Sequence, residues 1–330
     1  MSKEIIASTK QNICIIGSGS IGTALAQALA ESPVADTILL SIEEEVVNQI
    51  NNHHINSKYF PGLRLSEKVK ASADSAILND AGMIFLALPS VAVHSWVKEN
   101  SHLIQSQALL VNLAKGFGPD RKTITESLAE FPFPVAAMKG PSFARELING
   151  SPTAFTIGCT DTALWPLFSN VFRDTPVFLD FTKDIRGVEL LSILKNIYAI
   201  AVGMLDAQFN TANLRFLFLT RAFNEMRSIL LMFGGKKTTM FKYCGYGDFG
   251  LTALNDLSRN RTLGLLIGKG FFTDQISEKV LLEGKVAVNV FCGQILQSKD
   301  LSAFPIMEEL YRVFNGAYDV NAFARKMLEK

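Results

Sequence analysis

One lysine of this chain lies in a helical pattern that is otherwise apolar or aromatic except for a neighbouring asparagine. Lys195 and its neighbour Asn196 interrupt the run Ile193–Ala201. A helix that is apolar on every side is normally buried, and a buried lysine needs a partner or has a lowered pKa. Such a lysine can pass a proton to or from a carbonyl oxygen. We therefore interpret Lys195 as a candidate acid–base residue. The structural alternative is a lysine whose ammonium reaches the surface.

A glycine-rich turn near the N-terminus has the spacing of a dinucleotide-binding loop. The apolar run Ile13–Ile16 leads into Gly17-Ser-Gly-Ser-Ile-Gly22, and an alanine-rich helical pattern follows. In such a loop the first glycine permits a tight turn, the second lets the backbone approach a pyrophosphate, and the third lets the helix pack on the strand. The helix start adds free N–H groups and a positive dipole end. The alternative is a turn that binds nothing. The predicted cofactor contacts are Gly17, Ser18, Gly19, Ser20, Ile21 and Gly22.

Two lysines follow predicted strands at the edge where open α/β sheets bind their ligands. Lys115 comes after the segment Leu110-Val-Asn-Leu-Ala114. Lys139 comes after Val135–Met138 and precedes Gly140-Pro-Ser142. Lysine side chains and a serine at a helix start suit an anionic substrate such as a phosphate ester. The sequence therefore predicts a phosphate-binding edge, with solvated loop lysines as the alternative.

A glycine-rich segment and a basic run lie further along the chain. The segment Gly245-Tyr-Gly-Asp-Phe-Gly250 predicts a loop that can approach a ligand, and its Asp248 could orient an ammonium group. In the run Ser258-Arg-Asn-Arg261, Arg259 can hold a phosphate with two hydrogen bonds, and Asn260 stands beside it at a helix start. The alternative is a structural turn followed by a helix cap.

The first half of the chain alternates the patterns of strands and helices. Its apolar strand patterns are typical of parallel strands buried on both faces. This order predicts an α/β Rossmann domain over residues 1–187, with a doubly wound, mostly parallel sheet. Strands are predicted at Ile13–Ile16, Thr37–Ser41, Met83–Leu88, Leu109–Leu113, Val135–Met138, Thr153–Ile157 and Val177–Leu179.

Residues 188–330 have a different sequence pattern, because long helical patterns replace the strand patterns of the first half. They predict an all-helical domain that binds substrate and carries catalytic residues, joined to the first domain without a flexible linker. Helices are predicted at Val188–Met204, Arg215–Phe233, Arg261–Gly268, Ser277–Gln297 and Ile306–Phe314.

The composition excludes several classes of protein. The chain has 330 residues, 48% of them hydrophobic, and a formal net charge of +1, which gives no global field to recruit nucleic acid. Charges interrupt the long apolar stretches, so we predict no membrane span, and the N-terminal arm has no signal-peptide pattern. The four cysteines are far apart without a CxxC pair, which favours a reducing cytoplasm. The histidines lack partners at metal-ligand spacing, so no metal site is predicted.

Nine segments share their order and spacing with one enzyme family. They are Gly17–Ala28, Ala87–Ser90, Ala114–Gly116, Gly140–Glu146, Leu194–Gly203, Thr220–Met226, Gly245–Asp248, Ser258–Asn260 and Glu283–Gly284. Through them the chain resembles the bacterial NAD(P)-dependent glycerol-3-phosphate dehydrogenases over nearly its whole length. That family joins a Rossmann domain to a helical domain and usually forms homodimers. It interconverts dihydroxyacetone phosphate and sn-glycerol 3-phosphate, which supplies the glycerol backbone of phospholipids.

The resemblance implies roles for particular residues. Lys195 is similar to the family's proton donor and acceptor, with Asp248 and Thr252 as its support. Lys115 would contact both substrate and cofactor. The implied reaction is hydride transfer from the nicotinamide to C2 of the ketone, while Lys195 protonates the developing alkoxide. The other implied substrate contacts are Gly140, Ser142, Ser258, Arg259 and Asn260, and the remaining cofactor contacts are Arg259, Ala144, Leu281 and Glu283.

The residues after the second predicted strand bear on the choice of cofactor. Ile42 stands where the resembled family often has a basic residue that can hold a 2′-phosphate. Glu43 to Glu45 would repel that phosphate, whereas an acid can hydrogen-bond a free ribose hydroxyl. We therefore predict a preference for NAD over NADP. The alternative is that these glutamates only start the next helix.

Departures from the family pattern keep two other functions open. The stretches 209–215 and 249–256 are unusual, and Lys139 replaces a small residue and adds positive charge near the predicted pocket. A non-catalytic NAD-binding paralogue would fit such changes, although the retained lysines, Asp248 and Arg259 argue against it. Another two-domain Rossmann reductase, similar to the 3-hydroxyacid dehydrogenases, also uses a helix-borne lysine and asparagine. The Ser-Arg-Asn run favours a phosphorylated substrate instead.

Overall fold

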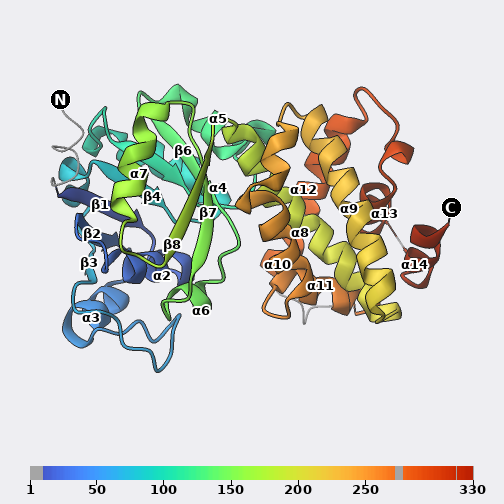
Figure 1. The fold of residues 1–330 in the computed structure, drawn as a ribbon, viewed down its shortest axis with the longest axis horizontal. Helices are drawn as coiled ribbons and strands as arrows, with labels where there is room; N and C mark the ends of the chain where they lie inside the picture. Colours follow the sequence, from blue (N-terminus) through green and yellow to red (C-terminus); the bar gives the residue numbers. More distant parts are fainter. Residues whose placement is uncertain (1–9, 272–277, 317, 330) are drawn as a thin grey trace. The chain divides into compact units, whose positions relative to one another are not determined.

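The structure, a computed structural model, describes residues 10–271, 278–316 and 318–329, and the side chains of residues 278–281 lie outside the description. The chain divides into two units, Met1–Glu189 and Leu190–Lys330. Figure 1 draws the first unit from blue to green and the second from yellow-green to red. The predicted division of labour between residues 1–187 and 188–330 stays a prediction.

The first unit contains strands β1 (Gln11–Ile16), β2 (Ala35–Leu40), β3 (Lys70–Ser72), β4 (Met83–Leu86), β5 (Leu109–Asn112), β6 (Val135–Lys139), β7 (Thr153–Gly158) and β8 (Val177–Thr182). They form one sheet in the order β3-β2-β1-β4-β5-β6-β7-β8 (Figure 1). Neighbouring strands are parallel except for the antiparallel pair β6 and β7. The predicted α/β Rossmann fold with a mostly parallel sheet is confirmed.

The sequence analysis missed strand β3. It has three residues, pairs with the end of β2, and buries Ala71 alone. So short a segment shows neither an apolar run nor an apolar–polar alternation. Only its pairing with β2 makes it a strand.

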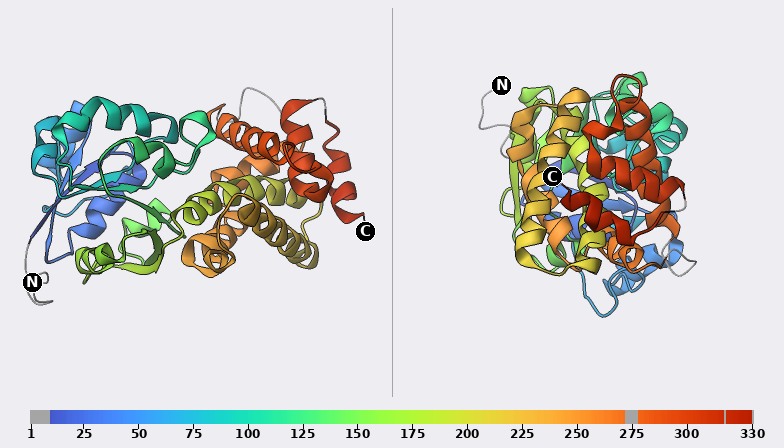
Figure 2. Two further views of the ribbon diagram at one scale, coloured as in Figure 1. Left: turned by 90° about the horizontal axis from the view of Figure 1, so that it is seen from above. Right: turned by 90° about the vertical axis from the view of Figure 1, so that its right-hand side faces the viewer.

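Successive residues of the central strands point to opposite faces of the sheet. Ile13 and Ile15 belong to one apolar core, whereas Cys14 and Ile16 belong to the other. Helices close both cores, as parallel strands buried on two faces require, and the left view of Figure 2 shows helices on both sides of the sheet. The first core is covered by α2 (Ser20–Leu29), α3 (Glu44–His53), α6 (Ala144–Leu147) and α7 (Trp165–Val171). The second is covered by α4 (Ser90–Asn100), α5 (Ile124–Ser127), η1 (Ser75–Asp80) and η4 (Leu128–Glu130). Short turns are η2 (Ser101–Leu103), η3 (Pro119–Arg121) and η5 (Thr162–Leu164).

The second unit is helical, as predicted. Its helices are α8 (Ile185–Gln208, which begins in the first unit), α9 (Ala212–Met232), α10 (Asp248–Leu254), α11 (Arg259–Gly268), α12 (Glu278–Ile295), α13 (Pro305–Asn315) and α14 (Asn321–Leu328). Short turns are η6 (Lys237–Phe241), η7 (Tyr243–Gly247) and η8 (Leu301–Ala303). The sequence analysis missed α10 and α14, since each has fewer than three turns and α10 follows a run of glycines.

Helix α8 runs through the core of the helical unit. It is long and apolar enough to cross a membrane by length and composition, yet 94% of its most apolar window is buried inside the protein. It packs closely on α11, because a Cβ at Gly203 would lie 2.2 Å from the carbonyl oxygen of Arg261. A Cβ at Gly264 would lie 2.0 Å from the carbonyl oxygen of Ile200. Glycines at both contact points therefore bring the two helix backbones together.

Candidate active site

Lys195 is buried in α8 and contacts two side chains of α10. Its Nζ donates to Asp248 Oδ1 and, at 3.1 Å, to Thr252 Oγ1. The Lys195 side chain is 3% exposed and that of Asp248 is 1% exposed. An ammonium out of water needs such partners, because an uncompensated buried charge is strongly destabilising. The surface-lysine alternative is therefore wrong. The contacts implied by the resemblance are present, and the catalytic role of Lys195 stays a prediction.

Asp248 is the first residue of α10 and directly follows η7, a single turn of π-helix. The expectation of a loop at residues 245–250 is therefore wrong. A Cβ at Gly245 would lie 2.1 Å from the carbonyl oxygen of Met240, so glycine is needed here for packing. Phe249 is buried and stacks on Phe223 with ring centroids 6.3 Å apart. The glycine-rich segment is thus a packed helical turn that fixes Asp248 in place, and such π-turns recur at functional sites.

One carboxylate oxygen of Asp248 is available for another group. Oδ1 accepts from Lys195, whereas Oδ2 is buried and has no hydrogen-bond partner within the described residues. Leaving a buried acceptor unsatisfied costs free energy, so such an atom in a native structure calls for an explanation. A substrate hydroxyl or a water next to Lys195 would satisfy it.

The basic run lies at the start of α11. Ser258 caps this helix, since its Oγ accepts from Arg261 N at 3.2 Å. Arg259 and Asn260 are then the first two helical residues; Arg259 is exposed and Asn260 is half-buried. Guanidinium and amide donors beside the free N–H groups of a helix start have the chemistry to hold a phosphate.

A buried carboxylate holds α11 against the unusual stretch 209–215. Asp206, near the end of α8, accepts from Arg261 Nη2 at 2.8 Å and from Arg215 Nε at 2.7 Å. Arg261 also pairs with Asp256. These ion pairs occupy Arg261 and Arg215 in structural contacts. Arg259 differs from them in its exposure, which leaves it accessible to a ligand.

In the first unit, the three glycines of the glycine-rich loop 17–22 have different surroundings. At Gly17 the φ angle is +102° and a Cβ would lie 2.8 Å from the carbonyl oxygen of Ala87. A Cβ at Gly22 would lie 2.0 Å from the carbonyl oxygen of Gly17. A Cβ at Gly19 would meet no atom within 4 Å. The first and third glycines are thus required by the protein itself, while the second faces open space where a pyrophosphate can approach.

The start of α2 adds hydrogen-bond donors to the glycine-rich loop, and the loop and the helix start together form the pyrophosphate cradle. Ser20 and Ile21 are its first residues, and the first N–H groups of a helix have no intrahelical acceptor. The cap residue, Gly19, supplies no side-chain hydrogen bond to them. The glycine loop and helix start therefore fit the pyrophosphate of a dinucleotide.

Side chains outside the segment 17–22 also hold the glycine-rich loop in place. Ser18 Oγ lies 2.6 Å from Ser41 Oγ, just beyond β2. The carbonyl oxygen of Ser18 accepts from Thr23 Oγ1 and from Asn56 Nδ2, each at 2.9 Å. Asn56 is fully buried. Sequence reasoning missed Ser41 and Asn56, because their partner is distant in the chain and no local pattern distinguishes them.

The two predicted lysines of the sheet edge have different environments. Lys115 is exposed just beyond β5. Lys139 is 1% exposed, and its Nζ donates to the carbonyl oxygens of Asn112 at 2.9 Å and Ala114 at 2.6 Å. The alternative of a solvated loop lysine is therefore wrong for Lys139. Its ammonium binds the backbone directly before Lys115 and orders that turn.

A buried glutamate holds the same turn from another side. Glu189, in the first turns of α8, accepts from Asn112 Nδ2 and from Thr125 Oγ1 and N. Asn112 Oδ1 accepts from Ala114 N at 2.8 Å. Asn112, Thr125 and Glu189 are all buried. The backbone before Lys115 is thus fixed by hydrogen bonds, and none of these three residues was predicted.

The segment after β6 holds the next predicted residues. A Cβ at Gly140 would lie 2.2 Å from the carbonyl oxygen of Ala154, so β7 requires glycine here. Ser142 Oγ donates to the carbonyl oxygen of Gly140 at 3.0 Å, and Ala144 begins α6. Both Ser142 and Ala144 are half-buried. Their contacts with substrate or cofactor stay predictions.

The remaining predicted contacts lie in α12. Glu283 is exposed, and Leu281 lies outside the residues whose side chains the structure describes. Within the described part of the chain, no group of three or more His, Cys, Asp or Glu residues could hold a metal ion. The four cysteines are free and buried, so no disulfide joins them.

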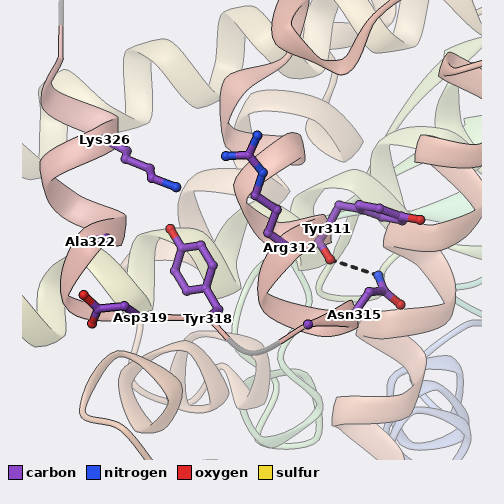
Figure 3. Close-up of a pocket in the computed structure, with 8 residues that line it drawn as sticks. Tyr311, Arg312, Asn315, Tyr318, Asp319, Ala322 and Lys326 are labelled. Atoms are coloured by element: carbon purple, nitrogen blue, oxygen red, sulfur yellow. Dashed lines mark hydrogen bonds between the residues drawn. The ribbon is translucent and has the colours of Figure 1, made fainter.

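A pocket of about 460 Å³ lies elsewhere, between α13 and α14 (Figure 3). Arg312, Tyr318 and Lys326 line it, and each of the three donates to the buried Glu309. These contacts tie α14 to α13. No predicted site residue lines this pocket, so we assign it to the packing of the two helices.

Each unit thus offers a distinct chemistry. The first has a glycine-rich cradle for a pyrophosphate and a lysine on an ordered turn at the sheet edge. The second has a buried lysine–aspartate pair suited to proton transfer at an oxygen, and an arginine at a helix start suited to a phosphate. An enzyme that reduces a carbonyl group in a phosphorylated substrate requires each of these chemistries.

Comparison with known proteins agrees with these features. Residues 12–165 match the family model of the NAD-dependent glycerol-3-phosphate dehydrogenase N-terminus, and residues 184–325 match that of its C-terminus. The glycerol-3-phosphate dehydrogenase [NAD(P)+] of Methanothermobacter thermautotrophicus is 32% identical over 323 residues, covering 96% of this chain and 98% of the relative. That of Xanthomonas euvesicatoria is 34% identical over 330 residues, covering 96% and 94%.

A solved structure agrees as well. The crystal structure of glycerol-3-phosphate dehydrogenase from Coxiella burnetii has a TM-score of 0.86 and 27% identity, covering 97% of this chain and 99% of that one. Both family models and relatives of nearly equal length therefore match the chain from the Rossmann unit to the helical unit. The chain belongs to the NAD-dependent glycerol-3-phosphate dehydrogenase family.

Proposed function

We propose that this protein is an NAD(P)-dependent oxidoreductase that interconverts dihydroxyacetone phosphate and sn-glycerol 3-phosphate. The observation that carries the proposal is the buried contact of Lys195 with Asp248 and Thr252, in a chain that matches both domains of the family. A non-catalytic paralogue would have no need for a buried ammonium beside an unsatisfied carboxylate oxygen. A 3-hydroxyacid reductase is not favoured, because Arg259 stands exposed at a helix start suited to a phosphate.

The proposed roles follow from the chemistry of each side chain. The nicotinamide, when bound, supplies or takes up the hydride at C2. Lys195 gives a proton to the C2 oxygen during reduction and removes it during oxidation. Asp248 and Thr252 hold the ammonium, and Asp248 Oδ2 accepts from a substrate hydroxyl. Arg259, with Ser258 and Asn260, holds the phosphate and so keeps C2 in position.

In the first unit, the glycine-rich loop holds the cofactor, and residues beyond β5 and β6 contact the substrate. Residues 17–22 bind the pyrophosphate, and Lys115 contacts both substrate and cofactor. Gly140 and Ser142 line the substrate pocket, and Ala144 lies beside the cofactor. The resemblance to the family supports further cofactor contacts at Arg259, Leu281 and Glu283. NAD is preferred over NADP, because Ile42 offers no charge for a 2′-phosphate and Glu43 opposes one.

We also propose that the protein works as a homodimer in the cytoplasm and supplies the glycerol backbone of phospholipids. The free, buried state of the four cysteines suits a reducing compartment. Sedimentation of the purified protein at several concentrations tests the dimer. A monomer at all concentrations would contradict it.

The decisive assay follows NADH absorbance with dihydroxyacetone phosphate as substrate. Dihydroxyacetone without phosphate is the matched control, and we expect it to react poorly because the phosphate contacts position C2. Lys195→Met keeps the apolar stem and removes the ammonium, so we expect NADH to bind and turnover to be lost. A protein that binds NADH but does not oxidise it with the phosphorylated ketone would refute the proposed activity.

A further inference from the structure

We propose that Glu43 and Lys58 together sort the two nicotinamide cofactors by the group on the adenosine 2′ carbon. Glu43 accepts a hydrogen bond from the free 2′-hydroxyl of NAD, and Lys58 binds the 2′-phosphate of NADP. This inference rests on the proposed dinucleotide site. It goes further because it assigns NADP acceptance to a residue that lies outside the glycine-rich loop and outside the strand that follows it.

The position of Glu43 is tied to the glycine-rich loop. Glu43 caps α3, two residues beyond Ser41, and its backbone N donates to Ser41 Oγ at 3.1 Å. Ser41 Oγ lies 2.6 Å from Ser18 Oγ of the loop. An acidic residue placed after the second strand of a Rossmann fold is suited to bind the ribose 2′-hydroxyl. Two hydrogen bonds thus connect the carboxylate-bearing residue to the pyrophosphate cradle.

Lys58 lies directly against this carboxylate. Its Nζ forms an ion pair with Glu43, and Tyr59 donates its hydroxyl hydrogen to the same carboxylate at 3.1 Å. The pair lowers the pKa of Glu43, chiefly through the hydrogen bond from Lys58. The Lys58 side chain is 57% exposed and that of Glu43 is 30% exposed. Exposed ion pairs contribute little to stability, so Lys58 can leave Glu43 for a phosphate at small cost.

The turn that carries Lys58 is anchored to the same loop. Tyr59 N and Phe60 N both donate to the carbonyl oxygen of Asn56. The buried Asn56 side chain donates to the carbonyl oxygen of Ser18 at 2.9 Å and to Thr23 Oγ1 at 2.9 Å. Lys58 is therefore held near the cradle by backbone contacts, and only its flexible side chain needs to move.

The charges explain why the cation matters. Ile42, 96% exposed, offers no charge, and Glu43 to Glu45 place three carboxylates around the start of α3. A phosphate group carries close to two negative charges at neutral pH, so these acids alone would exclude NADP. Lys58 supplies the opposing charge. NADH then remains the preferred cofactor, while NADPH is accepted with lower affinity because Lys58 must exchange one anion for another.

The test measures binding without turnover. Dissociation constants for NADH and NADPH come from the change in nicotinamide fluorescence, and those for adenosine 2′,5′-bisphosphate and adenosine 5′-phosphate come from calorimetry. Three variants are compared with the wild type. Lys58→Met removes the cation, Glu43→Gln removes the competing carboxylate charge, and Lys70→Met, at the far end of β3, is the control for general loss of positive charge.

We expect Lys58→Met to raise the dissociation constant of NADPH relative to that of NADH by about tenfold or more, because the variant loses one charge-assisted hydrogen bond to the 2′-phosphate. The dissociation constant of adenosine 2′,5′-bisphosphate, divided by that of adenosine 5′-phosphate, should rise by a similar factor. Glu43→Gln should lower the NADPH-to-NADH ratio, and Lys70→Met should leave it unchanged.

Two results would overturn the inference: equal effects of Lys58→Met on both cofactors, or a wild type that binds neither NADPH nor the bisphosphate. Turnover is a separate readout. Loss of 2′-phosphate discrimination in a protein that does not act on dihydroxyacetone phosphate would reject the proposed substrate and keep the inference. Normal turnover of dihydroxyacetone phosphate, together with unchanged discrimination between the two cofactors in the Lys58 variant, would keep the proposed substrate and reject the inference.

Discussion

Lys195 and Asp248 form an ion pair inside the helical unit, although they lie on helices that are far apart in the sequence. Asp248 accepts from Lys195 with one carboxylate oxygen and keeps the other without a partner within the described residues. A carboxylate placed in this way can do two things. It stabilises the protonated lysine, and it can accept a hydrogen bond from a hydroxyl that lies beside the reacting oxygen.

Replacing Asp248 by Asn tests the ion pair. Removal of the Asp248 charge takes away an opposite charge beside the buried Lys195 ammonium, which disfavours the protonated lysine and destabilises the fold. We expect kcat at neutral pH to fall by about 10²-fold or more, the range of acid–base contributions. Steady-state kinetics and thermal unfolding measure both effects. Thr252→Val is the matched comparison because it removes one neutral hydrogen bond, and an equal loss in both variants would argue against a special role for the carboxylate.

Replacing Arg259 by Ala tests the phosphate contact. Hydrogen bonds to charged groups contribute about 1.5–3 kcal/mol each, so we expect KM for dihydroxyacetone phosphate to rise about tenfold or more. Arg259→Lys should recover part of the affinity, because lysine keeps the charge but loses the two-pronged geometry. The inhibition constant of inorganic phosphate should weaken in the same order. A fall in kcat with unchanged KM would instead assign Arg259 to the chemical step.

Alanine at Gly19 and at Gly22 should separate cofactor binding from folding. A Cβ at position 19 meets no protein atom within 4 Å, whereas one at position 22 would lie 2.0 Å from the carbonyl oxygen of Gly17. We therefore expect Gly19→Ala to keep the thermal midpoint of the wild type and to weaken NADH binding. Gly22→Ala should lower the thermal midpoint even without cofactor. Calorimetric unfolding and NADH titration of both variants measure this, and the reverse pattern would place the pyrophosphate elsewhere.

Glu225 should make stability depend on pH. Burial raises the pKa of this carboxyl to about 7, although Tyr198 and the N–H groups of Ile306 and Met307 donate to it. Because the folded-state pKa lies above the unfolded value, the folded state binds more protons between pH about 4.5 and about 7. This group's contribution to the free energy of unfolding therefore falls as pH rises through that window. The change has an upper limit of about 3 kcal/mol.

Glu225→Gln is the matched variant, since it keeps the shape and removes the titration. Thermal midpoints of wild type and variant, followed from about pH 5 to about pH 8, should diverge in favour of the variant as pH rises. Parallel curves for the two proteins would show that Glu225 does not titrate in this range.

Local patterns predicted most of the fold. Apolar strand runs predicted seven of the eight strands, and long apolar helical patterns predicted α8, α9, α11, α12 and α13. These elements are determined by the periodicity of residues close together in the chain. The sequence patterns did not predict strand β3 and helices α10 and α14, because each of these elements is short. They form where tertiary contacts supply the free energy that their own residues cannot.

The sequence by itself determined the types of residue available for chemistry: the glycine spacing, the lysine in an apolar helix, and the arginine at a helix start. Tertiary structure decided which of them are buried and what they contact. Lys139 turns inward to backbone carbonyls, Asp248 starts a packed helix, and Lys58 comes to lie on Glu43. Spacing along the chain carries no information on such contacts, because burial and hydrogen-bond partners are set by segments distant in sequence that pack together only in the folded protein.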